Sequence, residues 1–484
     1  MRKFVTALSA FALLSACGGG GGDSPRPPVA GEPIGVVPPP PPPPSSQTPA
    51  GCSVRERQNW VGGQINEWYL FPETLPANRT PTQSTVEDYI DSLTATARAQ
   101  GRDRFFTYLT SIKEENAFFN SGSSAGFGFR LSLDSANRRL FVSESFEGAP
   151  ALAVGIDRGT EIVAIGTSAS DLRTVNAILN AEGSAGLNAA LGPPDVGVTR
   201  VLRITDAAGT RDVTVRKADF ELTPVSSRYG AKVIEDGGKR VGYVNLRTFI
   251  STADPALRAA FQNFRNAGIT EVVVDFRYNG GGLVSIANLM GDLLGRDRST
   301  QDIFSITAFR PEKSSNNSTR FFNPQPQSIA PTRLAFIGTG GTASASELVI
   351  NSMIPYLRER SALIGTNTFG KPVGQIALDR DQCDDRLRVV AFATQNAERQ
   401  GDYFQGLANK VGASCRAADD ITRPMGDPQE ASTRSALDFL AGRSCAPITS
   451  GGGQGGLSVS EGERRALLTP DRPSTVQREV PGAF

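Results

Sequence analysis

Hydrophobic residues between 52 and 119 recur at helix-like intervals. Trp60, Ile65 and Trp68 lie on one side of a predicted helix, and Tyr89 and Leu93 lie on one side of another. The pattern predicts a small helical cap at the N-terminal end of the folded part, over residues 52–119.

The pattern changes between residues 121 and 216, where short apolar runs alternate with Gly, Asp and Ser. Such runs are typical of strands separated by turns, so this stretch is predicted to be a small strand-rich module. The runs are Leu140–Val142, Glu161–Ile165, Thr199–Ile204 and Val213–Val215.

From residue 217 to residue 445, apolar strands alternate with amphipathic helices, which predicts an α/β core. The expected strands are 241–245, 272–276, 334–337 and 363–364, and the expected helices are 255–267, 283–294 and one after Ser344.

The two ends of the chain differ from the rest. Residues 1–17 resemble a bacterial export leader, and Leu14-Ser15-Ala16-Cys17 resembles a lipobox, which implies cleavage before Cys17 and lipidation of its thiol. The apolar run is too short to span a bilayer. The alternative is a plain secretory leader whose cysteine is not modified. Residues 18–51 are rich in Gly and Pro, which predicts a tether, and residues 446–484 are predicted to be a flexible tail.

The composition limits the catalytic mechanisms that are possible, because the chain of 484 residues contains no histidine. Hydrolases with a Ser-His-Asp or Cys-His site and H-E-x-x-H zinc proteases are therefore excluded. No metal or cofactor is expected. The net charge of +1 gives no indication of a nucleic-acid partner.

Cysteine use is consistent with an exported protein. Beyond Cys17, four cysteines remain, an even number that allows two disulfides in three pairings. The expected pairing is Cys383 with Cys415, and Cys52 with Cys445.

A candidate nucleophile follows a Gly-rich turn. Ser344 comes after the apolar strand ending near Ile337 and begins a helix, where free backbone N–H groups stabilise negative charge. The alternative is structural, because Ser344-x-x-Glu347 is also a common helix capping box.

Without histidine, lysine is a candidate base, and lysines are rare in the exported part. Lys371 follows an apolar strand, although a lysine in a turn is often only a surface residue. A third element is the loop Tyr278-Asn279-Gly280-Gly281-Gly282 between a strand and a helix, where consecutive glycines let backbone N–H groups converge on an anion.

Three motifs in this order resemble those of the S41 peptidases, the carboxy-terminal processing proteases. They are Asp275-x-Arg277-x-Asn279-x-Gly281-Gly282, Thr342-Ala343-Ser344-Ala345-Ser346-Glu347, and Phe369-Gly370-Lys371-x-x-x-Gln375. The resemblance implies a ClpP/crotonase-like α/β core with an inserted PDZ-like domain over residues 121–216. It also implies roles: Ser344 is the nucleophile, Lys371 the general base and Gln375 the residue that orients it. The N–H groups of Gly281 and Ala345 form the oxyanion hole.

The strand-rich module contains Gly126-Phe127-Gly128-Phe129, which resembles the carboxylate-binding loop of PDZ domains. Such a loop presents N–H groups to a peptide's terminal carboxylate while a strand edge pairs with the peptide.

The expected function is that of a serine endopeptidase that cleaves envelope proteins and recognises their accessible C-terminal tails. The expected location is the cell envelope, with a lipid anchor at Cys17 in the outer membrane facing the periplasm. Two alternatives stay open: a catalytically silent peptide-binding lipoprotein, and a structural protein of the envelope.

Overall fold

The computed structural model describes residues 49–449 and 465–484. All of them belong to one structural unit, which begins at Thr48. The predicted leader, the lipidation site Cys17 and nearly all of the predicted tether lie outside the described residues.

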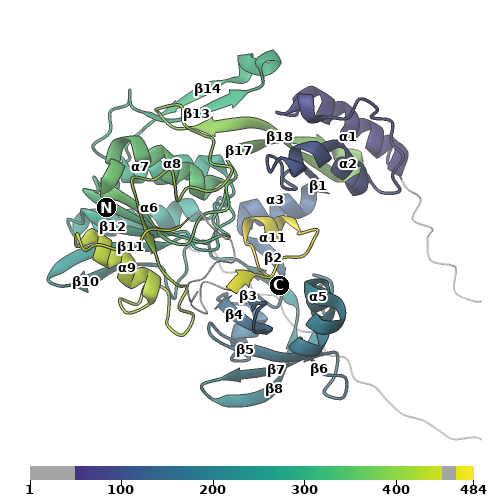
Figure 1. The fold of residues 1–484 in the computed structure, drawn as a ribbon, viewed down its shortest axis with the longest axis horizontal. Coiled ribbons are helices and arrows are strands. Elements are labelled where there is room, and N and C mark those ends of the chain that lie inside the picture. Colours follow the sequence, from purple (N-terminus) through teal and green to yellow (C-terminus); the bar gives the residue numbers. More distant parts are fainter. Residues whose placement is uncertain (1–48, 450–464) are drawn as a thin grey trace, which may run out of the picture. The chain divides into compact units, whose positions relative to one another are not determined.

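A six-stranded sheet forms the centre of an α/β core, as predicted (Figure 1). Its two strands at one edge are antiparallel and the remaining pairs are parallel. In sheet order the strands are β10 (Ala231–Asp236), β11 (Lys239–Asn245), β12 (Glu271–Asp275), β15 (Arg333–Gly338), β16 (Ser361–Gly365) and β19 (Ala413–Arg416).

Helices cover both faces of this sheet. Alternate side chains of β12 face opposite sides, so Val272 and Val274 pack with three helices while Val273 packs with the fourth. The three are α6 (Ala253–Asn266), α7 (Val284–Leu294) and α8 (Ala345–Leu357), and the fourth is α9 (Ala431–Leu440). The apolar runs of these parallel strands are therefore explained by burial on both faces.

A second sheet joins the N-terminal residues to the core. Its strands are β1 (Tyr108–Ser111), β18 (Asp385–Gln395), β13 (Ile303–Phe309), β14 (Ser318–Phe321) and β17 (Val373–Arg380), which pairs with β18. The predicted cap contains α1 (Val54–Trp68), α2 (Val86–Ala99) and α3 (Ile112–Ser121). The first two pack on β17 and β18 through a shared apolar cluster. The strand β1 within this region was not predicted, because its pairing with β18 joins residues almost 280 positions apart.

The strands of the strand-rich module form as predicted, with two additional helices. Its strands are β3 (Phe129–Asp134), β4 (Arg139–Ser145), β5 (Glu161–Gly166), β6 (Arg173–Thr174), β7 (Thr199–Asp206) and β8 (Gly209–Arg216), and β2 (Ser123–Gly126) pairs separately with β9 (Ala218–Glu221). The helices are α4 (Pro150–Ala153) and α5 (Val175–Leu191). The sequence did not indicate α5, which contains two glycines and has a non-helical φ of 64° at Gly183. Short 3₁₀ helices are Pro72–Thr74, Pro311–Asn316, Arg358–Arg360 and Asp381–Cys383.

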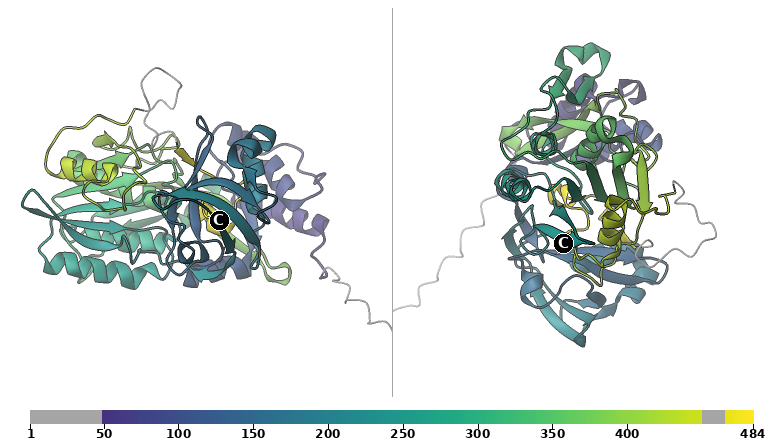
Figure 2. Two further views of the ribbon diagram at one scale, coloured as in Figure 1. Left: turned by 90° about the horizontal axis from the view of Figure 1, so that it is seen from below. Right: turned by 90° about the vertical axis from the view of Figure 1, so that its left-hand side faces the viewer.

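The predicted flexible tail is wrong for residues 465–484. These residues form β20 (Arg465–Leu467), which pairs with β3, and α11 (Thr475–Glu479). Figure 1 shows α11 in yellow beside α3, and both views in Figure 2 place the C-terminal end at the strand-rich module. The buried side chains of Leu468, Val480 and Ala483 explain the order, because they add apolar surface to the core.

The predicted disulfide pairing is also wrong. Cys52 bonds to Cys383 and Cys415 bonds to Cys445, with Cα atoms 5.5 and 5.4 Å apart. The reason is the packing of α1 on β18, which brings Cys52 to the turn that precedes β18. Sequence spacing alone does not reveal this contact.

The disulfide between Cys52 and Cys383 closes a loop of 331 residues, against 30 for the second one. We expect the double substitution Cys52→Ala/Cys383→Ala to lower the free energy of unfolding by about 2–5 kcal/mol, measured by urea denaturation. Loop-closure entropy predicts an effect about 2 kcal/mol smaller for Cys415→Ala/Cys445→Ala. An equal or larger loss in that second variant would contradict the argument.

Candidate active site

Ser344 lies between the Gly-rich turn after β15 and the first residue of α8. Its φ of 54° is in the left-handed region, which costs a non-glycine residue about 1–3 kcal/mol unless its surroundings hold it there. The residue is half-buried, and its backbone N–H donates to the Glu347 carboxylate at 3.1 Å. The helix start is thus built to hold one serine in a strained conformation.

Glu347 joins this helix start to the loop that carries Lys371. One carboxylate oxygen accepts from Ser344 N and from Lys371 N at 2.7 Å, and the other accepts from Gly370 N at 2.7 Å. Burial raises the pKa of Glu347, while these hydrogen bonds act in the opposite direction. The capping interpretation of Glu347 is therefore correct but incomplete, since the same carboxylate brings the backbones of Ser344 and Lys371 to one point.

The amine of Lys371 is oriented by a short relay. Its Nζ donates to Gln375 Oε1 at 2.8 Å, and Gln375 Nε2 donates to the backbone oxygen of Phe106. The Phe106 ring centre is 5.1 Å from Nζ and 5.9 Å from the Phe369 ring centre. Desolvation is the largest influence and lowers the pKa of Lys371; the charge of Glu479 raises it in part. Phe106 was missed by the sequence analysis because it lies 265 positions before Lys371.

The glycine loop lies directly against Ser344. A Cβ atom at Gly281, where φ is 121°, would be 2.7 Å from Ser344 Cβ and 3.1 Å from Ala345 N, so only glycine allows this approach. The N–H of Gly281, predicted to face an oxyanion, donates to Asn279 Oδ1 at 2.9 Å. The neighbouring N–H of Gly280 donates to the carbonyl oxygen of Glu479 at 3.0 Å.

These elements were compared with known proteins. Residues 240–402, which include Ser344, Lys371, Gln375 and the glycine loop, match the model of peptidase family S41. The chain contains an S41 peptidase domain. The chloroplastic carboxyl-terminal-processing peptidase 3 of Arabidopsis thaliana is 28% identical over 71% of this chain and 63% of its own length. The carboxy-terminal processing protease of Bacillus subtilis is 23% identical over 61% of this chain and 58% of its own length.

The chain thus spans about three fifths of the length of these two relatives. A crystal structure described as that of an S41 protease from Bacteroides fragilis superposes with a TM-score of 0.60 and 24% identity. The likeness covers 79% of this chain and 97% of that one. It supports the mixed α/β fold described above.

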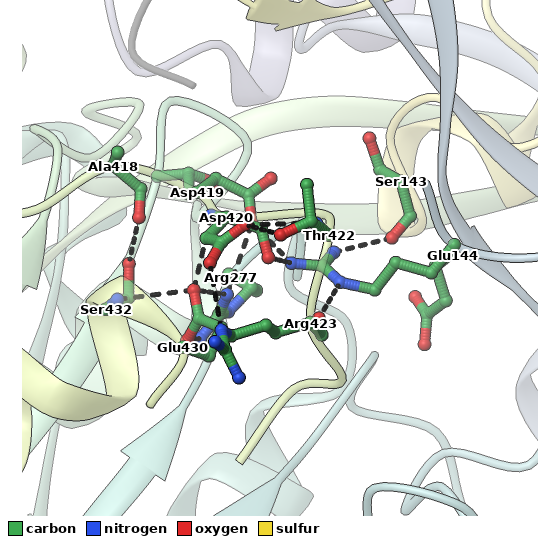
Figure 3. Close-up of polar contacts among 12 residues, drawn as sticks. Ser143, Glu144, Arg277, Ala418, Asp419, Asp420, Thr422, Arg423, Glu430 and Ser432 are labelled. Carbon is green, nitrogen blue, oxygen red and sulfur yellow. Dashed lines mark hydrogen bonds and ion pairs between the residues drawn. The ribbon is translucent and has the colours of Figure 1, made fainter. Parts of the chain in front are cut away.

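A buried ionic network around Arg277 lies next to the glycine loop in the sequence, and Figure 3 shows its contacts with Asp419 and Glu430. Arg277 donates to Asp275 and Glu430 at 2.9 Å each, and to Asp419 at 3.2 Å. Arg158, from the strand-rich module, donates to Asp419 at 2.8 Å and to the Tyr278 hydroxyl at 3.0 Å. The pKa of Asp419 is held well below its usual range by these two arginines, despite its burial. The network therefore connects the strand-rich module to Tyr278, the first residue of the glycine loop.

The predicted carboxylate-binding loop contacts the end of the same chain. Gly128 N donates to the backbone oxygen of Phe484 at 2.9 Å, and Phe484 N donates to Phe129 O at 3.0 Å. The rings of Phe127 and Phe129 are buried with centres 5.4 Å apart. The fourth predicted residue, Gly126, approaches Phe484 so closely that a Cβ there would be 2.8 Å from its carbonyl carbon.

Over residues 49–449 and 465–484, no three His, Cys, Asp or Glu side chains are grouped as a metal site would require. Within the same ranges, no helix combines the length and apolar character needed to cross a bilayer. A pocket beside Lys371 is lined by Phe106, Gly280, Ala343 and, from the C-terminal segment, Arg478 and Glu479.

Proposed function

We propose that this chain is a serine endopeptidase in which Ser344 attacks the peptide bond and Lys371 acts as general base. The observation that carries the proposal is the shared contact of both residues with Glu347. This carboxylate accepts hydrogen bonds from the backbone of the candidate nucleophile and of the candidate base within 3.1 Å. The S41 domain supplies the family context.

In the first step the neutral amine of Lys371 takes the proton from Ser344 Oγ as this oxygen forms a bond to the substrate carbonyl carbon. The protonated amine then gives that proton to the leaving nitrogen, and the C–N bond breaks to leave an acyl-enzyme. Water releases the acyl group by the same route in reverse. The N–H of Ala345 at the start of α8 stabilises the oxyanion, together with the N–H of Gly281 once that group turns away from Asn279 Oδ1.

The base must be neutral, and an unperturbed lysine opposes this. With a pKa of about 10.4, the neutral form at pH 7 costs about 4.6 kcal/mol. Desolvation beside Phe106 reduces this cost, and Gln375 accepts one N–H so that the remaining lone pair can be aimed at Ser344.

We also propose that the strand-rich module works as a PDZ-like domain that recognises the accessible C-terminal tails of envelope proteins. Support comes from the Gly128 N–H, which donates to a backbone carbonyl group, and from the outer edge of β3, which pairs only with residues of the C-terminal segment and not with another strand of the module. A lipid anchor at Cys17, facing the periplasm from the outer membrane, completes the proposal and would be seen as a diacylglyceryl-modified N-terminal peptide by mass spectrometry.

The protonation of Lys371 provides a test. We expect the rate at which a fluorophosphonate labels Ser344 to rise about tenfold per pH unit and to level off below pH 10.4, because the folded pKa is lowered. The stability of the protein also increases with pH. The charged amine of Lys371 is costly in the fold, so the free energy of unfolding increases as pH rises from the folded to the unfolded pKa of this residue. A stopped labelling assay with site identification measures the first effect. Labelling that is independent of pH would contradict the role of Lys371 as base. Absent labelling while tail peptides still bind would favour the silent peptide-binding lipoprotein.

A further inference from the structure

The free edge of β3 is occupied by the C-terminal segment of the chain. Residues 482–484 pair with 129–131, through Leu131 N to Gly482 O at 2.8 Å and Phe484 N to Phe129 O at 3.0 Å. Strand β20 pairs with residues 132–134 further along the same edge. The other edge of β3 is bonded to β4. A peptide that adds a strand to β3 would need the positions that this segment fills.

The same segment passes over the active site. The carbonyl oxygen of Glu479 accepts from Gly280 N at 3.0 Å, and a Cβ at Gly280 would lie 2.1 Å from the carbonyl oxygen of Arg478. Arg478 is held beside the site, because it donates to Phe105 O at 2.7 Å and stacks on the Tyr108 ring at 3.8 Å. The main chain at 478–479 therefore lies where a substrate would reach the glycine loop.

Apolar side chains fix the segment in place. Val480 and Ala483 are buried in a cluster with Phe118 and Phe146, and the Phe484 ring packs on the apolar core of the strand-rich module. Arg130, itself fully buried, donates both to Pro481 O and to Tyr278 O. The segment is thus hydrogen-bonded to the module. Through Arg130 it is also linked to Tyr278, the first residue of the glycine loop.

We propose that residues 475–484 are an intramolecular, substrate-like inhibitor that substrate tails must displace before cleavage. The proposal rests on the proposed function, because the β3 groove that the segment fills and the glycine loop and Lys371 beside which it lies belong to the sites assigned above. The displacing ligand has the chemistry of the residues that pair with β3: an extended stretch of small residues followed by an aromatic one, as in Gly482-Ala483-Phe484. The buried Glu479 carboxylate strengthens the inhibition, since its charge favours the protonated form of Lys371.

The test compares two identical substitutions on the edge of β3 in the full chain, one inside residues 475–484 and one outside them, in β20. Ala483 is 6% exposed and pairs with Arg130, whereas Ala466 is exposed and pairs with Leu133. Ala483→Asp buries a charge if the segment stays bound, so it should release residues 475–484 and raise fluorophosphonate labelling of Ser344 at least tenfold. Ala466→Asp should leave the rate within twofold of the unmodified chain. Equal rates in the two folded variants would overturn the proposal.

A binding measurement separates this proposal from the proposed function. In a Ser344→Ala background, a fluorescent peptide with the sequence of residues 475–484 should bind the Ala483→Asp chain at least tenfold more tightly than the Ala466→Asp chain, read by anisotropy. If the Ala483→Asp chain binds the peptide more tightly but no chain is labelled at Ser344, the inhibitor proposal is supported and the catalytic assignment is refuted. Equal labelling and equal binding would refute the inhibitor and keep the catalytic assignment. If thermal melting shows that Ala483→Asp is unfolded, Phe484→Asp, at a half-buried position, replaces it with the same criteria.

Discussion

Ser344→Ala and Lys371→Ala are each expected to lower the rate of cleavage of an unstructured protein at least about 1,000-fold and to leave the fold intact. The first removes the attacking oxygen and the second removes the base. The chain contains no histidine that could take over the role of the base. The structural cost of Lys371→Ala is small, about 1 kcal/mol, because the side-chain hydrogen bond that is lost is the one to Gln375. Gel-based proteolysis together with circular dichroism measures both effects.

Lys371→Arg tests the role of the base more closely. A guanidinium keeps the positive charge and can contact Gln375, but it cannot be deprotonated in the accessible pH range. We therefore expect the same loss of cleavage as in Lys371→Ala. Lys239→Ala, at an exposed pair with Glu271, and Ser314→Ala, on the surface, serve as controls. Retained cleavage in Ser344→Ala, Lys371→Ala or Lys371→Arg would refute the assignment of that residue.

Arg277→Met is expected to lower the free energy of unfolding by about 3–5 kcal/mol. The guanidinium is fully buried and neutralises Asp275 and Glu430, which are also fully buried, so its removal leaves carboxylates without their partner. Burial already raises the pKa of Asp275, and the charge of Arg277 is what opposes this. Urea denaturation followed by tryptophan fluorescence measures the loss.

Arg434→Met is the matched control for Arg277→Met. Arg434 also contacts two carboxylates, those of Asp236 and Asp438, but its side chain is 33% exposed. Ion pairs in contact with water contribute about 0–1 kcal/mol, so this variant should remain close to the unmodified chain. A loss of less than 1 kcal/mol in Arg277→Met would show that the network in Figure 3 does not hold the glycine loop.

Local sequence patterns predicted the α/β core and the main strands of the module. The runs around Val272–Val274 and Leu334–Ile337 are apolar because both faces of the sheet are covered, and that burial leaves a clear signal. The position of Ser344 at a helix start could also be predicted, since a Gly-rich turn separates it from its strand. These features depend on neighbours within about ten residues.

The features that the sequence did not reveal depend on distant contacts. The pairing of Cys52 with Cys383 follows from how α1 packs, and the bond from Gln375 to Phe106 joins residues 269 positions apart. Residues 465–484 were predicted to be flexible because Gly-rich sequence precedes them, although Val480 and Ala483 are buried. A short apolar segment carries little signal when its partners are Phe118 and Phe146, more than 300 residues earlier.

The covered edge of β3 also bears on how the protein behaves at high concentration. An uncovered strand edge offers unpaired N–H and C=O groups on which a strand from another molecule can align. While residues 465–468 and 482–484 stay bonded to β3, a second copy finds no such template there. Any condition that releases the C-terminal segment therefore also leaves the edge of β3 unpaired. A chain in this state should self-associate more readily, unless a peptide pairs with β3 in place of the segment.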